Sequence, residues 1–183
     1  VGLLSLTYVP NYFDILPMYI VILGLMPLMI FASRLHPYLP FAAMIVLWLG
    51  AQAGLTQLPA EPWSSRTWFF DPFGWQLLFF TGFFLMRGNL PVPPLDRRFM
   101  VLAIGIVFVT VPFAWIRFQV DHPFFQMAAR NIAFLTGKSD FGLLRFVHFL
   151  ALAYIAVHAV GERGARLRGP VVRVLMVVGQ QSL

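Results

Sequence analysis

The chain has 183 residues, of which 60% are hydrophobic and only 11% are charged, and its mean hydropathy is +0.79. A soluble domain carries about 25% charged residues, so this composition excludes an ordinary soluble protein and indicates a protein of the lipid bilayer. The net charge is +6, but the basic residues lie in short connections between apolar runs, which favours membrane orientation over nucleic-acid binding. Cysteine is absent, which excludes disulfides and thiolate ligands, and we expect no metal site.

Five apolar runs predict an all-α fold, a polytopic bundle with about five complete membrane crossings. Pro27 and Pro112 lie inside two of these runs and predict kinks there. The run that starts at Pro72 is short for a full crossing. The expected helices cover residues 15–32, 39–55, 72–86, 99–116 and 143–160.

A sixth apolar segment begins near Val171, and the sequence stops about a dozen residues later. Because Val1 is not an initiator Met, we expect residues 1–183 to form a single transmembrane domain that is an interior part of a longer chain. The longest connection, residues 117–141, contains His122-Pro123 before an amphipathic pattern. This pattern predicts one interfacial helix.

Lysine and arginine fall unequally on the two sides of the predicted bundle. Eight lie on the side of the shorter connections and five on the other side. By the positive-inside rule the first side is cytoplasmic, which places residues 8–14, 56–70 and 117–141 outside.

The candidate site residues are polar groups beside or within the apolar runs, because the sequence has no soluble-enzyme signature. Arg145 and His148 lie three positions apart on one helix, a pattern that suits an anionic ligand or proton transfer, or else snorkelling and a helix–helix hydrogen bond. Gln76 is costly inside an apolar helix and predicts a polar neighbour. Asp71 and Asp14 are further candidates, although each also suits a helix cap, Asp14 together with Asn11.

Four stretches resemble the OpgC family, in order and over nearly the whole sequence. They are YVPNYFDILPMY (8–19), FDPFGWQLLFFTG (70–82), GKSDFGLLRFVHFLALAY (137–154) and GQQSL (179–183). Two departures are Asp71, where the family is expected to have Asn, and Gln180, where it is expected to have Arg.

The resemblance implies a multi-pass protein of the bacterial inner membrane, similar to the type-three membrane acyltransferases. It implies an O-acyltransferase that moves a succinyl group from an acyl-CoA donor (succinyl-CoA) to a periplasmic glucan, with no bound cofactor. The superfamily's catalytic His is expected upstream of this sequence. Two other possibilities stay open, a non-catalytic OpgC-like subunit of a larger membrane complex and a transporter.

Overall fold

The computed structural model describes residues 6–10 and 13–161, which divide into two compact units. Unit 1 comprises residues 1–93 and 130–146, and unit 2 comprises residues 94–129 and 147–183. Within the described residues there are helices and one isolated β-bridge, between Pro59 and Thr67, and no strand, so the predicted all-α class is confirmed. The elements are α1 (Ile15–Leu35), α2 (Leu39–Gln52), α3 (Pro72–Met86), α4 (Arg97–Ala114), α5 (Ile116–Asp121), α6 (Pro123–Asn131), the 3₁₀ helix η1 (Ala133–Leu135) and α7 (Leu143–Val160).

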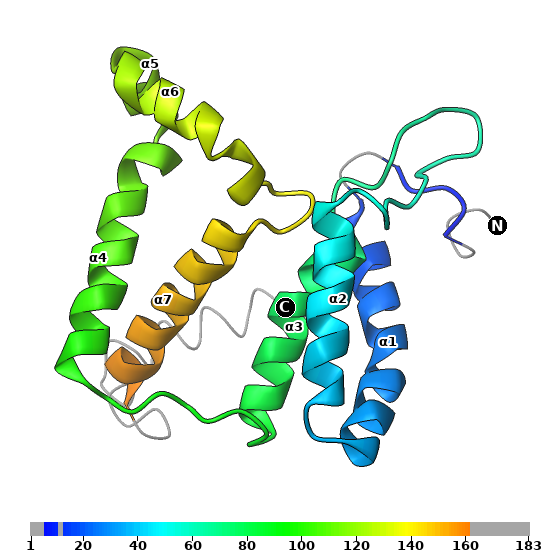
Figure 1. Cartoon of the computed structure of the whole chain (residues 1–183). Coiled ribbons are helices and arrows are strands. Elements are labelled where there is room, and N and C mark those ends of the chain that lie inside the picture. Colours follow the sequence, from blue (N-terminus) through cyan, green and yellow to red (C-terminus); the bar gives the residue numbers. More distant parts are fainter. Residues whose placement is uncertain (1–5, 11–12, 162–183) are drawn as a thin grey trace, which may run out of the picture. The chain divides into compact units, whose positions relative to one another are not determined.

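Unit 1 is built on three helices, α1, α2 and α3, each of which contacts the other two (Figure 1). The buried positions of each helix recur at helical spacing, so that one face of each turns toward the others. The resulting core contains Met18, Ile22, Met29, Met44, Leu77, Phe80 and Phe84. The starts of α1 and α3 and the end of α2 lie at the same end of this bundle. The candidate site lies at that end.

A second, smaller apolar cluster is built largely from the connection between α2 and α3. Val9, Ala60 and Trp68 are its buried members. The backbone amide of Val9 donates to the carbonyl of Ala60 at 2.8 Å, and the Trp68 indole donates to the carbonyl of Pro59 at 3.1 Å. These bonds fold the connection back on itself, so that it is not an open loop.

Unit 2 contains α4 and most of α7, which are joined by side-chain hydrogen bonds. The Nδ1 atom of His148 lies 2.9 Å from the Thr110 hydroxyl, and the Tyr154 hydroxyl donates to the carbonyl of Pro94 at 2.8 Å. Asp96 caps α4 by accepting from the Arg98 amide at 2.7 Å. The α4 helix therefore begins two residues before the predicted start.

The predicted helix limits are confirmed for α3 and α7 and need small corrections elsewhere. The α1 helix continues to Leu35, and the Ser33 hydroxyl bonds to the carbonyl of Ile30 within it. The α2 helix ends at Gln52 because the chain turns at Gly54, whose φ of 70° suits glycine. The α4 helix ends at Ala114, since Trp115 is extended. An amphipathic α6 begins at Pro123, as predicted.

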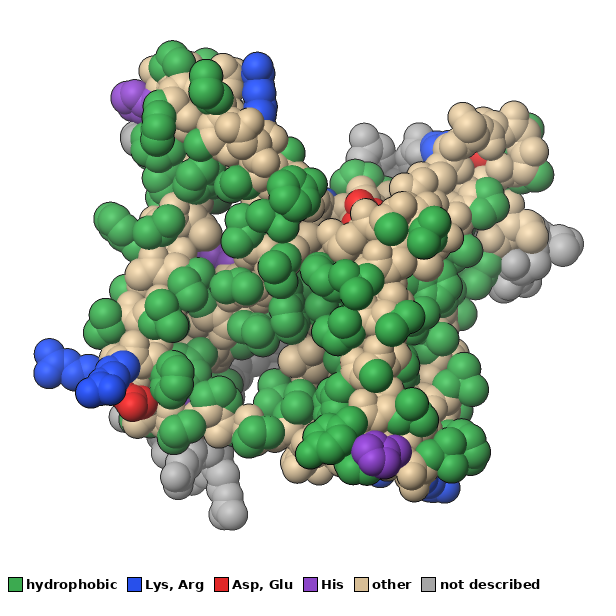
Figure 2. Space-filling model, in the orientation of Figure 1, with side chains coloured by type: hydrophobic (Ala, Val, Ile, Leu, Met, Phe, Trp, Pro, Cys, Tyr) green, Lys and Arg blue, Asp and Glu red, His purple; other side chains and the backbone are tan. Residues whose placement is uncertain are grey.

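Three described helices, α1, α4 and α7, are long and apolar enough to cross a membrane. Hydrophobic side chains cover the visible helix surfaces of each unit, and Lys and Arg side chains gather near helix ends (Figure 2). The apolar helices α2 and α3 have 14 and 15 residues, about 21–23 Å at 1.5 Å per residue, against a hydrocarbon core of roughly 30 Å. Five crossings thus remain a prediction. The start of a sixth segment near Val171, the basic stretch 163–173 and Gln180 lie outside the described residues.

Candidate functional site

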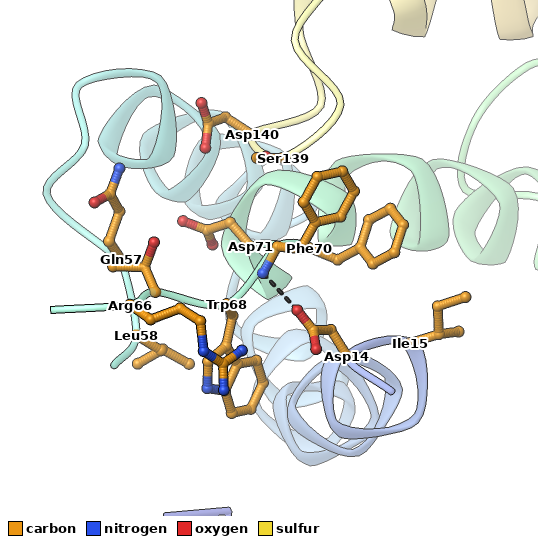
Figure 3. Close-up of a pocket in the computed structure, with 12 residues that line it drawn as sticks. Asp14, Ile15, Gln57, Leu58, Arg66, Trp68, Phe70, Asp71, Ser139 and Asp140 are labelled. Atoms are coloured by element: carbon orange, nitrogen blue, oxygen red, sulfur yellow. Dashed lines mark hydrogen bonds between the residues drawn. The ribbon is translucent and has the colours of Figure 1, made fainter. Parts of the chain in front are cut away.

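A cavity of about 790 Å³ lies at the end of the unit 1 bundle where α1 and α3 begin. Three separate parts of the chain meet there: the start of α1, the connection before α3, and the segment before α7 (Figure 3). Its polar and aromatic lining includes Asp14, Arg66, Trp68, Asp71, Ser139 and Asp140.

Asp14 is a buried carboxylate, and only one of its two oxygens accepts a hydrogen bond from the part of the chain that the structure describes. Its side chain is 2% exposed, and Oδ2 accepts from the backbone amide of Phe69 at 2.6 Å (Figure 3). Oδ1 is buried and has no hydrogen-bond partner among the described residues. A buried carboxylate oxygen is costly without a donor, so a ligand hydroxyl would find an open acceptor here.

The alternative interpretation, in which Asp14 serves as a helix cap together with Asn11, is not supported at Asp14. Asp14 occupies the residue before α1, but its side chain makes no capping bond, and Asn11 lies outside the described residues. One of its two carboxylate oxygens instead accepts from the Phe69 amide, which lies 55 positions away in the sequence. Local spacing suggests a cap, whereas the tertiary contact decides the outcome.

Asp71 is buried and caps α3, as predicted. Its Oδ1 accepts from the amides of Phe73 at 2.8 Å and Gly74 at 3.4 Å, and its Oδ2 accepts from the Thr56 hydroxyl at 2.9 Å. Burial raises the pKa of the Asp71 carboxyl, and these donors act in the opposite direction. The nearby charge of Asp140 raises the same pKa further. The two carboxyl groups therefore interact.

Asp140 reaches the cavity from the segment before α7, and burial raises the pKa of its carboxyl as well. Its backbone lies directly on the first turn of α3. A Cβ atom added at Gly74 would be 2.7 Å from the carbonyl carbon of Asp140, closer than such atoms approach. Only glycine at this position of α3 lets the segment come so near.

Arg66 is the cation that lines the cavity, and its guanidinium is held by other groups. Its Nη2 donates to the carbonyl of Val9 at 2.6 Å and to Glu61 at 3.2 Å. The hydrogen bond from Arg66 lowers the pKa of Glu61. The three aspartates of the lining thus outnumber a single, already paired arginine.

Gln76 is fully buried in α3, and its polar neighbours are backbone carbonyls. Its Nε2 donates to the carbonyl of Met44 in α2 at 2.8 Å and to that of Phe73 at 3.0 Å. Its Oε1 has no partner among the described residues. Gln76 does not line the cavity and joins two helices of the core.

Arg145 and His148 share α7 but bind different groups. The Arg145 guanidinium donates to the carbonyls of Thr136 at 3.0 Å and Gly137 at 3.3 Å, both in the segment before α7. His148 bonds to Thr110 within unit 2. Neither residue is among those that line the cavity.

The cavity contains residues that reasoning from the sequence did not single out, namely Arg66, Ser139 and Asp140. A signal was present, because Ser139 and Asp140 belong to the stretch GKSDFG before α7. What the sequence does not reveal is that this stretch lies on the same bundle end as Asp14 and Asp71.

Apolar helices of spanning length indicate a membrane protein, and buried carboxylates gather at one end of its three-helix unit. The model of the family described as "OpgC protein" matches residues 1–183, so the chain belongs to the OpgC family. The search of curated proteins gave no match. The search of solved structures gave none either.

Proposed function

We propose that the chain belongs to a membrane O-acyltransferase that transfers an acyl group, succinyl by family resemblance, to a glycan, and that the unit 1 cavity binds the glycan acceptor. The observation that carries this proposal is the combination of three aspartates with aromatic side chains around one cavity. Membership of the OpgC family supports this proposal, and the reaction class is the one that the family resemblance implies.

The lining suits a neutral sugar. Carboxylates accept hydrogen bonds from hydroxyl groups, and Asp14 offers a buried oxygen without a partner among the described residues. Trp68, Phe69 and Phe70 add apolar ring surface, and Phe69 is 51% exposed. A cavity with ring surfaces and a few placed polar groups is typical of small-ligand sites.

The same lining disfavours the acyl donor. An acyl-CoA carries phosphates, and a succinyl group carries a carboxylate of its own. Both would meet Asp14, Asp71 and Asp140, while Arg66 is engaged by Glu61 and the carbonyl of Val9. Like charges brought together in a partly buried site are strongly unfavourable. We therefore assign the cavity to the acceptor alone.

The predicted orientation supports an acceptor from the periplasm. The cavity is lined by residues 57–58 and 66–71, at the end of unit 1 that the positive-inside rule places outside. The general base that activates the sugar hydroxyl is expected to be the superfamily's upstream His. Transfer itself is thus not assigned to a residue of this cavity.

Binding of a neutral β-glucan oligosaccharide to the full-length protein in nanodiscs tests the proposal. Asp14→Asn and Asp140→Asn should each weaken binding about tenfold or more, because each removes a charged acceptor while keeping the side-chain shape. Asp96→Asn is a matched control, since Asp96 caps α4 in unit 2 and does not line the cavity. Unchanged affinity in both cavity variants would refute the acceptor assignment.

Two further measurements separate the other possibilities. Binding without acyl transfer by the complete protein would favour a non-catalytic subunit, which would bring the glycan to other proteins. Uptake of the oligosaccharide into sealed vesicles would favour a transporter. Transfer to the oligosaccharide without uptake supports the enzyme.

A further inference from the structure

Every backbone carbonyl from Thr136 to Phe141 accepts a hydrogen bond from another part of unit 1. Arg145 binds the first two, as described above. The carbonyl of Lys138 accepts from the Trp75 indole at 3.0 Å, and that of Ser139 accepts from the Asp71 backbone amide at 3.0 Å. The carbonyl of Asp140 accepts from the Gln52 side-chain amide at 2.6 Å, and that of Phe141 accepts from the Trp48 indole at 3.0 Å.

Five of these six bonds have side-chain donors, three of them from α2 and α3, which is unusual for a loop, whose carbonyls generally bind water. Trp48 and Gln52 lie one helical turn apart on α2, and so reach two adjacent carbonyls. Trp75 reaches a third carbonyl from α3. The backbone of residues 136–141 is therefore held in one conformation by rigid helices.

Phe141 fixes the far end of the same segment. It is 2% exposed, and its ring centroid lies 4.7 Å from that of Trp75. Its φ of 54° is uncommon for a residue with a side chain, so the surrounding contacts hold it there. Ser139 and Asp140, between the anchored positions, line the cavity.

We propose that residues 136–141 form a preorganised edge of the cavity, in which Ser139 and Asp140 contact the ligand through their side chains. Trp48, Gln52, Trp75 and Arg145 are positioning residues that hold this edge in place. This inference rests on the proposed function, since the ligand is the neutral glycan acceptor. Its physical basis is that a segment fixed before binding loses less conformational entropy when the ligand arrives.

The assignment also changes the role of Arg145. Its guanidinium is already hydrogen-bonded to Thr136 and Gly137, so it acts through the segment and does not neutralise an anionic acyl group. Because Ser139 offers a hydroxyl and Asp140 a carboxylate, the edge supplies both a donor and an acceptor for sugar hydroxyls. A neutral polyol matches this pair better than an anion does.

The test uses the full-length protein with Trp48→Phe and Trp75→Phe combined, which removes two N–H donors and keeps aromatic rings in place. Trp63→Phe is the control, because Trp63 is 70% exposed, packs against Tyr8 and does not line the cavity. We measure the dissociation constant for a neutral β-glucan oligosaccharide, amide hydrogen exchange of residues 137–142, and the unfolding midpoint.

In the double variant we expect faster exchange confined to residues 137–142 and about tenfold weaker glucan binding, with little change in the unfolding midpoint. Where transfer is assayed, KM for the acceptor should rise while kcat stays near the original value, because the edge positions the acceptor. Ser139→Ala should also weaken binding. If the indoles had a merely structural role, the unfolding midpoint would fall, and KM would not rise at constant kcat.

The possible failures are distinguishable. If Asp14→Asn weakens glucan binding but the double Trp variant binds normally despite faster exchange, the acceptor site stands and the preorganised edge is wrong. If the double variant shows no faster exchange, the edge is also wrong, because the indole bonds do not hold the segment. If neither the aspartate nor the tryptophan variants affect binding, the proposed function itself fails.

Discussion

Gly74 in α3 and Asp140 before α7 are in direct backbone contact, and the absence of a Cβ atom at Gly74 is what permits it. Gly74→Ala should push the Asp140 segment away and cost about 1–3 kcal/mol of unfolding free energy, as overpacking typically does. Gly82→Ala is the matched control on the same helix, since nothing lies within 4 Å of its added Cβ. Unfolding in detergent measures both, and equal stability of the two variants would contradict the contact.

Asp71 should tolerate asparagine but not alanine. Asparagine keeps an oxygen for the amides of Phe73 and Gly74, whereas Asp71→Ala loses the cap of α3 and leaves Thr56 without its acceptor. We expect a loss of about 1–2 kcal/mol for Asp71→Ala and roughly 0.5 kcal/mol or less for Asp71→Asn. Comparable losses in the two variants would indicate that the charge matters more than the cap.

Asp140 should make the protein less stable as the pH rises from acid toward neutral. Burial raises the pKa of its carboxyl above the ordinary 3.8, so the folded chain retains a proton that the unfolded chain has released. Stability therefore falls with rising pH from about 4 until the folded carboxyl has ionised, and is then level. Asp140→Asn should gain stability relative to the original protein above this window and match it below about pH 3.8.

The comparison of unfolding midpoints at several pH values measures this effect together with the release of Asp71 from the neighbouring charge of Asp140, which acts in the same direction. A constant difference at every pH would mean that burial does not perturb Asp140.

The sequence predicted the helices well where a local signal marks their ends. Asp71-Pro72 gave the start of α3 correctly, since a capping carboxylate before a proline is a local pattern. The end of α2 was placed three residues late, because the turn at Gly54 was not recognised. The start of α4 was placed two residues late, because the Asp96 cap was not recognised.

The candidate site was only partly predictable, for reasons that Gln76 and Asp14 illustrate. The requirement for a polar neighbour of Gln76 follows from its chemistry, but its identity as the carbonyl of Met44 depends on how α2 packs. Asp14, Asp71 and Asp140 were brought together by tertiary contacts between distant stretches. No periodic pattern in the sequence indicates that these three aspartates meet.

The predicted orientation has its own test in intact cells. A cysteine introduced at Ser65, in the connection before α3, should react with a membrane-impermeant maleimide added outside. A cysteine at Gly88, in the Arg-containing connection after α3, should react only after the membrane is opened. The chain has no cysteine, so the background is clean. The opposite labelling pattern would place the cavity on the cytoplasmic side.

Photo-crosslinking with a neutral glucan oligosaccharide that carries a diazirine tests most directly whether the unit 1 cavity is the acceptor site. The full-length protein in nanodiscs is irradiated with the probe, digested, and mapped by mass spectrometry. We expect labels within residues 66–71 and 138–140, lost when unlabelled glucan is in excess and reduced by Asp14→Asn. Competable labels confined to other residues, with none on these two stretches, would contradict the assignment of the acceptor to this cavity.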